Sequence, residues 1–119
     1  MATFTKTILS GSTDGKGILV AQTASAGTTI HTGPTNTAHL HEVWLYAVNY
    51  DSTDRKLTVQ WGGTTAGTDD IEYTVKAESG LYLIAPGLLL KGNATPLVVR
   101  AFAATATAIV IHGYVNTIT

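Results

Sequence analysis

The stretch from His39 to Tyr50 (HLHEVWLYAVNY) places the tightest constraint on the fold. Alternate residues of a β-strand point to opposite faces, and here both faces are apolar, with Val43 on one and Trp44 on the other. A strand that is apolar on both faces is expected to be covered on both, as central strands are. We therefore predict that residues 38–50 form a central strand around which the rest of the chain packs.

The rest of the sequence has the pattern of short strands separated by turns. Residues 57–61 (LTVQW) and 71–75 (IEYTV) alternate between apolar and polar side chains, as strands with one solvated face do. Residues 107–115 form a second run that is apolar on both faces, and no helical apolar spacing lasts for three turns. Eight to ten short strands predict an all-β fold, with the pattern of a β-sandwich, jelly roll or small barrel. Among these we predict an antiparallel β-sandwich of jelly-roll type.

The polar turn at residues 51–54 (DSTD) predicts how the central strand is paired. Residues 38–50 and 55–61 flank this turn, so a hairpin between them is the most local pairing available. Within the second strand, Thr58 and Gln60 alternate with apolar residues. They are therefore expected to face solvent.

At 119 residues the chain has the size of one domain. We expect residues 17–119 to form a single sandwich domain. Residues 3–9 alternate in polarity, so residues 1–16 are either an extended N-terminal arm or the first strand. The sequence start lacks the pattern of a signal peptide, and no apolar run approaches the ~20 residues that span a bilayer.

Charge and cysteine content exclude several classes of function. Seven basic and eight acidic residues provide no basic patch for nucleic acid or for a membrane surface, so neither partner is expected. The lack of cysteine excludes disulfides and thiolate metal sites. Charged residues make up 13% of the chain, about half the usual share, which suggests that part of the surface is hidden against partners.

The sharpest candidate for a binding site is the pair His39 and His41. On a strand their imidazoles project to the same face, and His31 or His112 could supply a third ligand for zinc. In the alternative, the histidines flank a strand and bond to backbone or water. Because cysteine is absent and Glu42 points to the opposite face, we favour this alternative and predict no metal and no other cofactor.

The sequence contains no arrangement typical of catalysis. No serine stands in a Gly-x-Ser-x-Gly motif, and Gly11–Lys16 is one residue short of a phosphate-binding Walker loop. The acidic residues at 51–54 and 69–72 could bind calcium or act as a carboxylate pair, but they lack the regular Asp-x-Asp-x-Asp-Gly spacing. The tryptophans and tyrosines could stack on sugars, although a small sandwich usually buries them. We therefore expect a protein that is not an enzyme.

Four segments taken together resemble small virion structural proteins of tailed bacteriophages, of the type encoded beside the major capsid protein. Some members of this group are head decoration (cement) proteins. The resemblance covers about residues 18–118. It rests on EVWLYAVN at 42–49, LTVQWGGT at 57–64, SGLYLIAPGL at 79–88 and the closing Val110-x-x-Gly-Tyr-Val-Asn116.

This resemblance implies a binding role on the capsid surface of the virion. A decoration protein sits outside the expanded capsid, commonly as a homotrimer at local three-fold positions, and clamps neighbouring capsid subunits. The implied partners are the major capsid protein and further copies of the chain, with assembly in the host cytoplasm. Residues 1–16 are the predicted contact segment, with Phe4, Lys6, Ile8 and Leu9 as its candidate interface residues.

A second interpretation keeps the chain in the virion but changes its partner. As a tail or head-fibre module, it would bind a host surface glycan. That role predicts exposed aromatic side chains at a loop end of the sandwich.

Overall fold

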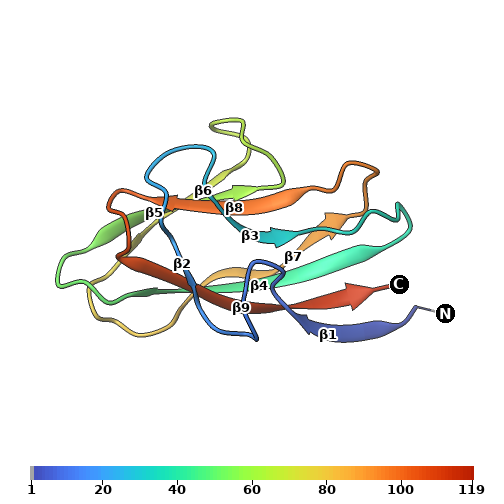
Figure 1. Ribbon diagram of the computed structural model, residues 1–119, viewed down its shortest axis with the longest axis horizontal. Helices are drawn as coiled ribbons and strands as arrows, with labels where there is room; N and C mark the ends of the chain where they lie inside the picture. The colour runs from blue at the N-terminus through green and yellow to red at the C-terminus, as the bar shows by residue number, and fades with distance from the viewer. Residues whose placement is uncertain (1) are drawn as a thin grey trace.

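The computed structural model describes residues 2–119, which form two layers of antiparallel β-sheet (Figure 1). This part of the chain contains strands and no helix. The strands are β1 (Phe4–Ile8), β2 (Ile18–Leu19), β3 (Thr28–Thr32), β4 (Leu40–Asn49), β5 (Arg55–Trp61), β6 (Asp70–Val75), β7 (Tyr82–Lys91), β8 (Val98–Ala103) and β9 (Ile109–Ile118). The predicted all-β class and strand number are confirmed, and the two sheets are compatible with the predicted sandwich.

The two sheets differ in size and strand order. The five-stranded sheet has the order β1-β9-β4-β7, with β2 pairing with β9 next to β1. The four-stranded sheet has the order β3-β8-β5-β6. Most connections therefore carry the chain from one sheet to the other, whereas β5 and β6 pair within one sheet as a local hairpin.

The predicted hairpin between residues 38–50 and 55–61 is wrong, because β4 and β5 belong to different sheets. The reason lies at Asn49, the last residue of β4, which is fully buried. Its Nδ2 donates hydrogen bonds to the carbonyl oxygens of Thr53 and Val75 at 2.9 and 3.0 Å. These bonds hold the polar segment after β4 as a crossover between the layers.

The prediction that β4 is a central strand is confirmed. It pairs with β9 over its whole length and with β7 on its other side. Val43 and Leu45 are fully buried between the two sheets. The expectation that both faces of β4 are covered is wrong, because Trp44 and Tyr46 on the opposite face are only half-buried. Within residues 2–119, neighbouring strands flank these two side chains, but no second layer covers them.

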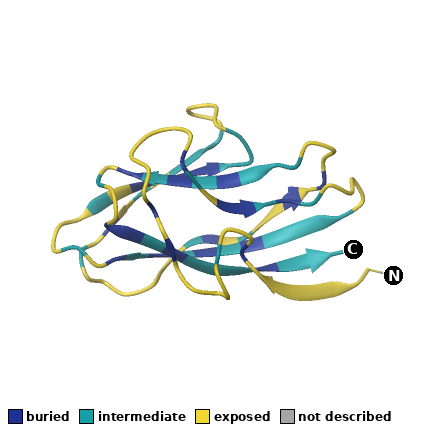
Figure 2. Cartoon of the chain, in the orientation of Figure 1, coloured by how far each residue is buried: buried dark blue, intermediate teal, exposed yellow. Residues whose placement is uncertain are grey.

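Both layers contain buried residues (Figure 2), and their side chains form one core between the layers. Each fully buried valine, leucine or isoleucine side chain in this core stabilises the fold by roughly 1.5–3 kcal/mol. The five-stranded sheet contributes Val43, Leu45, Ala47, Ile111 and Val115, and the four-stranded sheet contributes Ile30, Leu57, Val59, Val99 and Ala101.

Part of the outward face of the four-stranded sheet, around Gln60, is covered by the loop before β3. Thr58 and Gln60 were expected to face solvent, but they are buried, with 3% and 1% of their surface exposed. Gln60 Oε1 accepts a hydrogen bond from the amide of Gly27, and its Nε2 donates to Ser25 Oγ, both at 2.9 Å. For Gln60 the expectation fails because alternation shows that this residue points away from the core, but not that the loop before β3 bonds to its side chain.

The N-terminal segment belongs to the sheet. Residues Phe4–Ile8 pair in antiparallel register with β9 and form an edge of the five-stranded sheet. This arrangement corresponds to the first-strand alternative rather than to a detached arm. All five residues of β1 are exposed (Figure 2).

Candidate functional site

The face of the five-stranded sheet that points away from the four-stranded sheet is called the outer face here. Its side chains form rows across the strands, because residues directly opposite in an antiparallel pair share a face. The middle row runs Ile8, Tyr114, Trp44 and Pro86. The next row runs Lys6, Asn116, Glu42 and Leu89, and the row at the sheet end runs Phe4, Ile118, Leu40 and Lys91.

Large apolar side chains on the outer face are exposed. Phe4 is 69% exposed, Leu89 53%, Ile8 50% and Leu83 42%. Monomeric soluble proteins rarely leave extended apolar patches uncovered, and such patches mark interaction sites. Aromatic residues at the centre with few charges around them also match the composition of protein interfaces.

The centre of the outer face is held in place by a bonded cluster. The rings of Trp44 and Tyr114 are nearly parallel, with an angle of 9° and centroids 6.0 Å apart. Trp44 Nε1 and Asn116 Nδ2 each donate a hydrogen bond to Oε1 of Glu42 at 2.8 Å. Gly87 (φ +76°) lies against the indole, where an added Cβ would be 3.0 Å from its ring atoms. The aromatic pair is thus fixed by neighbours on β4, β7 and β9.

Two opposite charges lie beside this aromatic pair. The hydrogen bond from Trp44, and then the one from Asn116, lower the pKa of Glu42, so its carboxylate is ionised at neutral pH. Lys6 Nζ lies 4.8 Å from the centroid of the Tyr114 ring, within the range of a cation–π contact. The outer face therefore combines an apolar body with one anchored anion and one anchored cation.

Three of the four predicted interface residues lie on the outer face. Phe4, Lys6 and Ile8 are opposite residues of β9 that point outward. Leu9 has to be removed from the set, because it is 1% exposed and belongs to the core. The chain turns inward directly after β1, and the amide of Gly11 donates to the carbonyl oxygen of Ile30 at 2.9 Å.

The sequence prediction missed the part of the outer face that lies on β4, β7 and β9. The signal was present as the second apolar face of residues 39–50 and 107–115. We interpreted that second face as buried, whereas the structure leaves it without a covering layer. An apolar face on a central strand fits a covered interior position and an exposed binding surface equally well.

The histidines do not assemble into the zinc site considered above. His112 lies on the outer face, whereas His41 points to the interior side of the same sheet. Buried His31 reaches His41 directly, with 2.9 Å between its Nε2 and His41 Nδ1, and its Nδ1 accepts the amide of Ser10 at 3.0 Å. No group of three potential metal ligands occurs within residues 2–119. Burial, and then the charge of His41, lower the pKa of His31 to about 4.

The acidic residues that could have bound calcium serve to hold loops. Asp51 forms an ion pair with Arg55 at 2.6 Å, and this guanidinium lowers its pKa. Asp54 accepts the amide of Ala77 at 2.8 Å, which lowers the pKa of that carboxyl. Asp69 Oδ2 accepts the amide of residue 65 at 2.9 Å. Asp51, Asp54 and Asp69 thus each have a partner within the chain, whereas the buried Oδ1 of Asp70 has no hydrogen-bond partner among the described residues.

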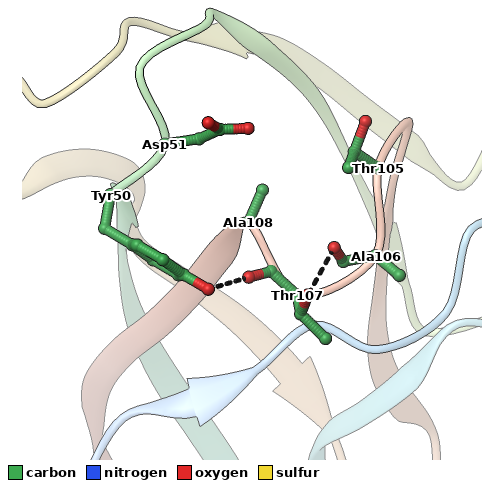
Figure 3. Close-up of a pocket in the computed structure, with 6 residues that line it drawn as sticks. All are labelled: Tyr50, Asp51, Thr105, Ala106, Thr107 and Ala108. Carbon is green, nitrogen blue, oxygen red and sulfur yellow. Dashed lines mark hydrogen bonds between the residues drawn. The ribbon is translucent and has the colours of Figure 1, made fainter.

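A shallow depression of about 270 Å³ lies at one loop end of the molecule (Figure 3). Tyr50, which is 61% exposed as a residue, forms one wall, and its hydroxyl donates to the carbonyl oxygen of Thr107. The carboxylate of Asp51 lies across from the side chain of Thr105 in this view. The lining residues are Tyr50, Asp51, Thr105, Ala106, Thr107 and Ala108.

Comparison with known proteins adds no relative. No family model, no curated protein and no solved structure matches this chain significantly. Among residues 2–119 there is no helix long and apolar enough to cross a membrane.

Proposed function

We propose that this chain is a non-enzymatic structural protein of a phage virion that binds the capsid exterior as a decoration protein. The outer face of the five-stranded sheet is its docking surface, and the major capsid protein is the partner. The observation that carries this proposal is the exposure of Phe4, Ile8, Leu83 and Leu89 on one face that no other part of the described chain covers.

We infer that the strand order is that of a jelly roll. In support, β1 and β2 lie beside β9, followed by β4 and β7, while the opposite sheet runs β3-β8-β5-β6. β1 and β2 both lie on the same side of β9 and together occupy one strand position. Each of the two layers therefore has four strand positions. Jelly rolls occur in viral capsid proteins and in lectins, so the architecture suits both a capsid-binding and a glycan-binding role without deciding between them.

The outer face suits repeated binding on a lattice. A stiff two-layered body presents Trp44 and Tyr114 in fixed positions, so little side-chain freedom is lost on binding. Decoration proteins commonly assemble as homotrimers at local three-fold positions, and we propose the same for this chain. Many copies on one shell would then stabilise it by avidity even if each contact is weak.

Co-sedimentation with expanded phage capsids tests the proposal. The wild-type chain is expected to sediment with expanded capsids. Leu89→Asp places a charge on the outer face and is expected to reduce the bound fraction strongly. Ala66→Asp adds the same charge in the exposed loop between β5 and β6, and is expected to bind like the wild type. Equal binding by both variants would overturn the proposed docking surface. If the wild type does not sediment with capsids, the proposed function is overturned.

A second candidate function is glycan binding by a tail or head-fibre module. Tyr50 favours it, because this aromatic ring is exposed at a loop end and has the Asp51 carboxylate beside it (Figure 3). Binding to a panel of bacterial surface glycans, compared between the wild type and Tyr50→Ala, tests this role. Glycan binding that is lost in Tyr50→Ala and kept in Leu89→Asp would favour the fibre module over the decoration protein.

A further inference from the structure

The backbone of β1 alternates between residues bonded to β9 and residues directed away from it. Thr3 and Thr119 exchange both of their backbone hydrogen bonds, at 2.9 and 3.0 Å. In an antiparallel ladder, bonded pairs recur at every second residue. Thr5 and Thr7 therefore bond to β9. The N–H and C=O groups of the residues before, between and after these two threonines point to the open edge of the sheet.

The residues with outward backbone groups are Phe4, Lys6 and Ile8. β1 is the terminal strand of its sheet, and no hydrogen bond within residues 2–119 uses the backbone of these three residues on that edge. Their side chains point to the outer face, next to Ile118, Asn116 and Tyr114 of β9. An edge of this kind is a template for one more strand.

The side chains along the edge decide what kind of strand fits. Lys6 lies between two apolar side chains and has no carboxylate within 4.0 Å in the described chain, while its Nζ is held over the Tyr114 ring. Two copies of β1 aligned with Phe4 opposite Ile8 would place their lysines opposite each other, which is destabilising. An acidic residue opposite Lys6 would instead be stabilised by the opposite charge.

We propose that the open edge of β1 binds an extended segment of a partner protein as an additional antiparallel strand. In that segment an acidic residue faces Lys6, and apolar residues two positions before and after it pack beside Phe4 and Ile8. Backbone bonds to the three outward residues supply affinity, and the Lys6 contact supplies selectivity. The inference rests on the proposed function only for naming the capsid protein as the source of the segment.

Two synthetic peptides test the edge without a capsid. Ac-Val-Thr-Glu-Thr-Val-amide carries the predicted pattern, and Ac-Val-Thr-Lys-Thr-Val-amide is its charge-reversed control. In amide-resolved NMR titrations of the full chain at low salt, the Glu peptide is expected to shift the amides of Phe4, Lys6 and Ile8 and to slow their hydrogen exchange. It is also expected to bind several-fold more tightly than the Lys peptide. Equal binding of both peptides, or shifts confined to other strands, would overturn the proposal.

Substitutions at residue 6 separate the backbone from the side chain. Lys6→Glu is expected to reverse the peptide preference. Lys6→Pro removes an edge N–H without removing a bond to β9, which edge strands tolerate. It is expected to weaken binding more than Lys6→Ala, which keeps that N–H. Unchanged β9 amide shifts would show that each variant is folded, and equal binding by the Pro and Ala variants would exclude backbone pairing.

The same variants distinguish this inference from the proposed function. If Lys6→Glu binds expanded capsids as the wild type does while Leu89→Asp does not, the outer face docks on the capsid and the assignment of the edge segment to the capsid protein is wrong. If the wild type binds no capsid but selects the Glu peptide, the edge inference stands and the capsid is not the partner. If the chain forms dimers at higher concentration and this shifts the amide signals of Phe4, Lys6 and Ile8, a second copy of the chain binds the edge. That result would overturn the proposal.

Discussion

Nε2 of His31 lies 2.9 Å from Nδ1 of His41, and this contact joins the two sheets at one end of the core. His31 Nδ1 already accepts the amide of Ser10 at 3.0 Å, so its proton is placed on Nε2 and donated to His41. The neighbouring Ser10 Oγ accepts the amide of Thr32 at 2.7 Å. A neutral His31 therefore links the segment after β1 to β3 and to β4.

Stability is predicted to fall on mild acidification. The pKa of His31 is lowered to about 4 by burial and then by His41, whereas an unfolded histidine has a pKa near 6.5. Between these values the unfolded chain binds a proton that the folded chain does not, so stability is full above pH 6.5 and declines as the pH falls towards 4. The loss is up to about 3 kcal/mol. Urea unfolding at several pH values between 7.5 and 4 measures it.

The control for this pH dependence is His31→Gln, which removes the titrating ring. Its unfolding free energy is expected to vary much less between pH 6.5 and 4.5. Carboxylates with lowered pKa values, such as Asp51 and Asp54, contribute in a separate window, because their stabilisation is lost only as the pH falls below the usual carboxyl range. An undiminished slope in His31→Gln would assign the effect to other groups.

The pKa of Glu42 is predicted to report the geometry of the outer face. Trp44 Nε1 and Asn116 Nδ2 both donate to its Oε1, which lowers the pKa of this carboxyl. Trp44→Phe keeps an aromatic ring but removes the donor, so the pKa of Glu42 is expected to rise. Asn116→Ala should raise it less, because the Trp44 bond is the larger cause. Carbon-detected NMR titration of the carboxyl group measures both shifts, and no change in Trp44→Phe would contradict the cluster.

The all-β class could be predicted from the sequence because alternation is a local property of each strand. The centrality of β4 could also be predicted, since its apolar residues are contiguous in the chain. The pairing of β4 with β9 rather than β5 could not be predicted, because the partners of Asn49 after the end of β4, such as the carbonyl oxygen of Val75, lie far away in the sequence. Proximity in the sequence therefore does not predict strand pairing where the chain crosses from one sheet to the other.

The candidate site was predicted at its edge and missed at its centre. Phe4, Lys6 and Ile8 could be placed on one side of a strand because residues 3–9 alternate in polarity. Trp44 and Tyr114 could not be assigned to a surface, because the sequence does not show which apolar face another layer covers. The burial of the polar residue Gln60 could not be predicted either, because the loop that covers it is distant in the sequence.

Gln60 is predicted to hold the loop before β3 against the four-stranded sheet. Gln60→Ala leaves the Gly27 amide without its acceptor and removes the donor to Ser25 Oγ. Losing buried hydrogen bonds of this kind costs about 1–3 kcal/mol. The free energy of unfolding should fall by that amount, and the Gly27 amide should exchange faster with solvent. Gln22→Ala, an exposed change in the same loop region, should leave both values nearly unchanged. Unaltered Gly27 exchange in Gln60→Ala would contradict this role.

Ile8 and Leu9 are adjacent in the chain but are predicted to differ in what their truncation disrupts. Leu9 is 1% exposed in the core, so Leu9→Ala is expected to cost about 2–5 kcal/mol of unfolding free energy. Ile8 is 50% exposed on the outer face, so Ile8→Ala should cost less than about 1 kcal/mol. Its effect is expected in co-sedimentation with expanded capsids, where a smaller fraction of the variant should bind. Denaturant titration and co-sedimentation of both variants separate a core residue from a surface residue. A large loss of stability in Ile8→Ala, or none in Leu9→Ala, would contradict the turn of the chain into the core after β1.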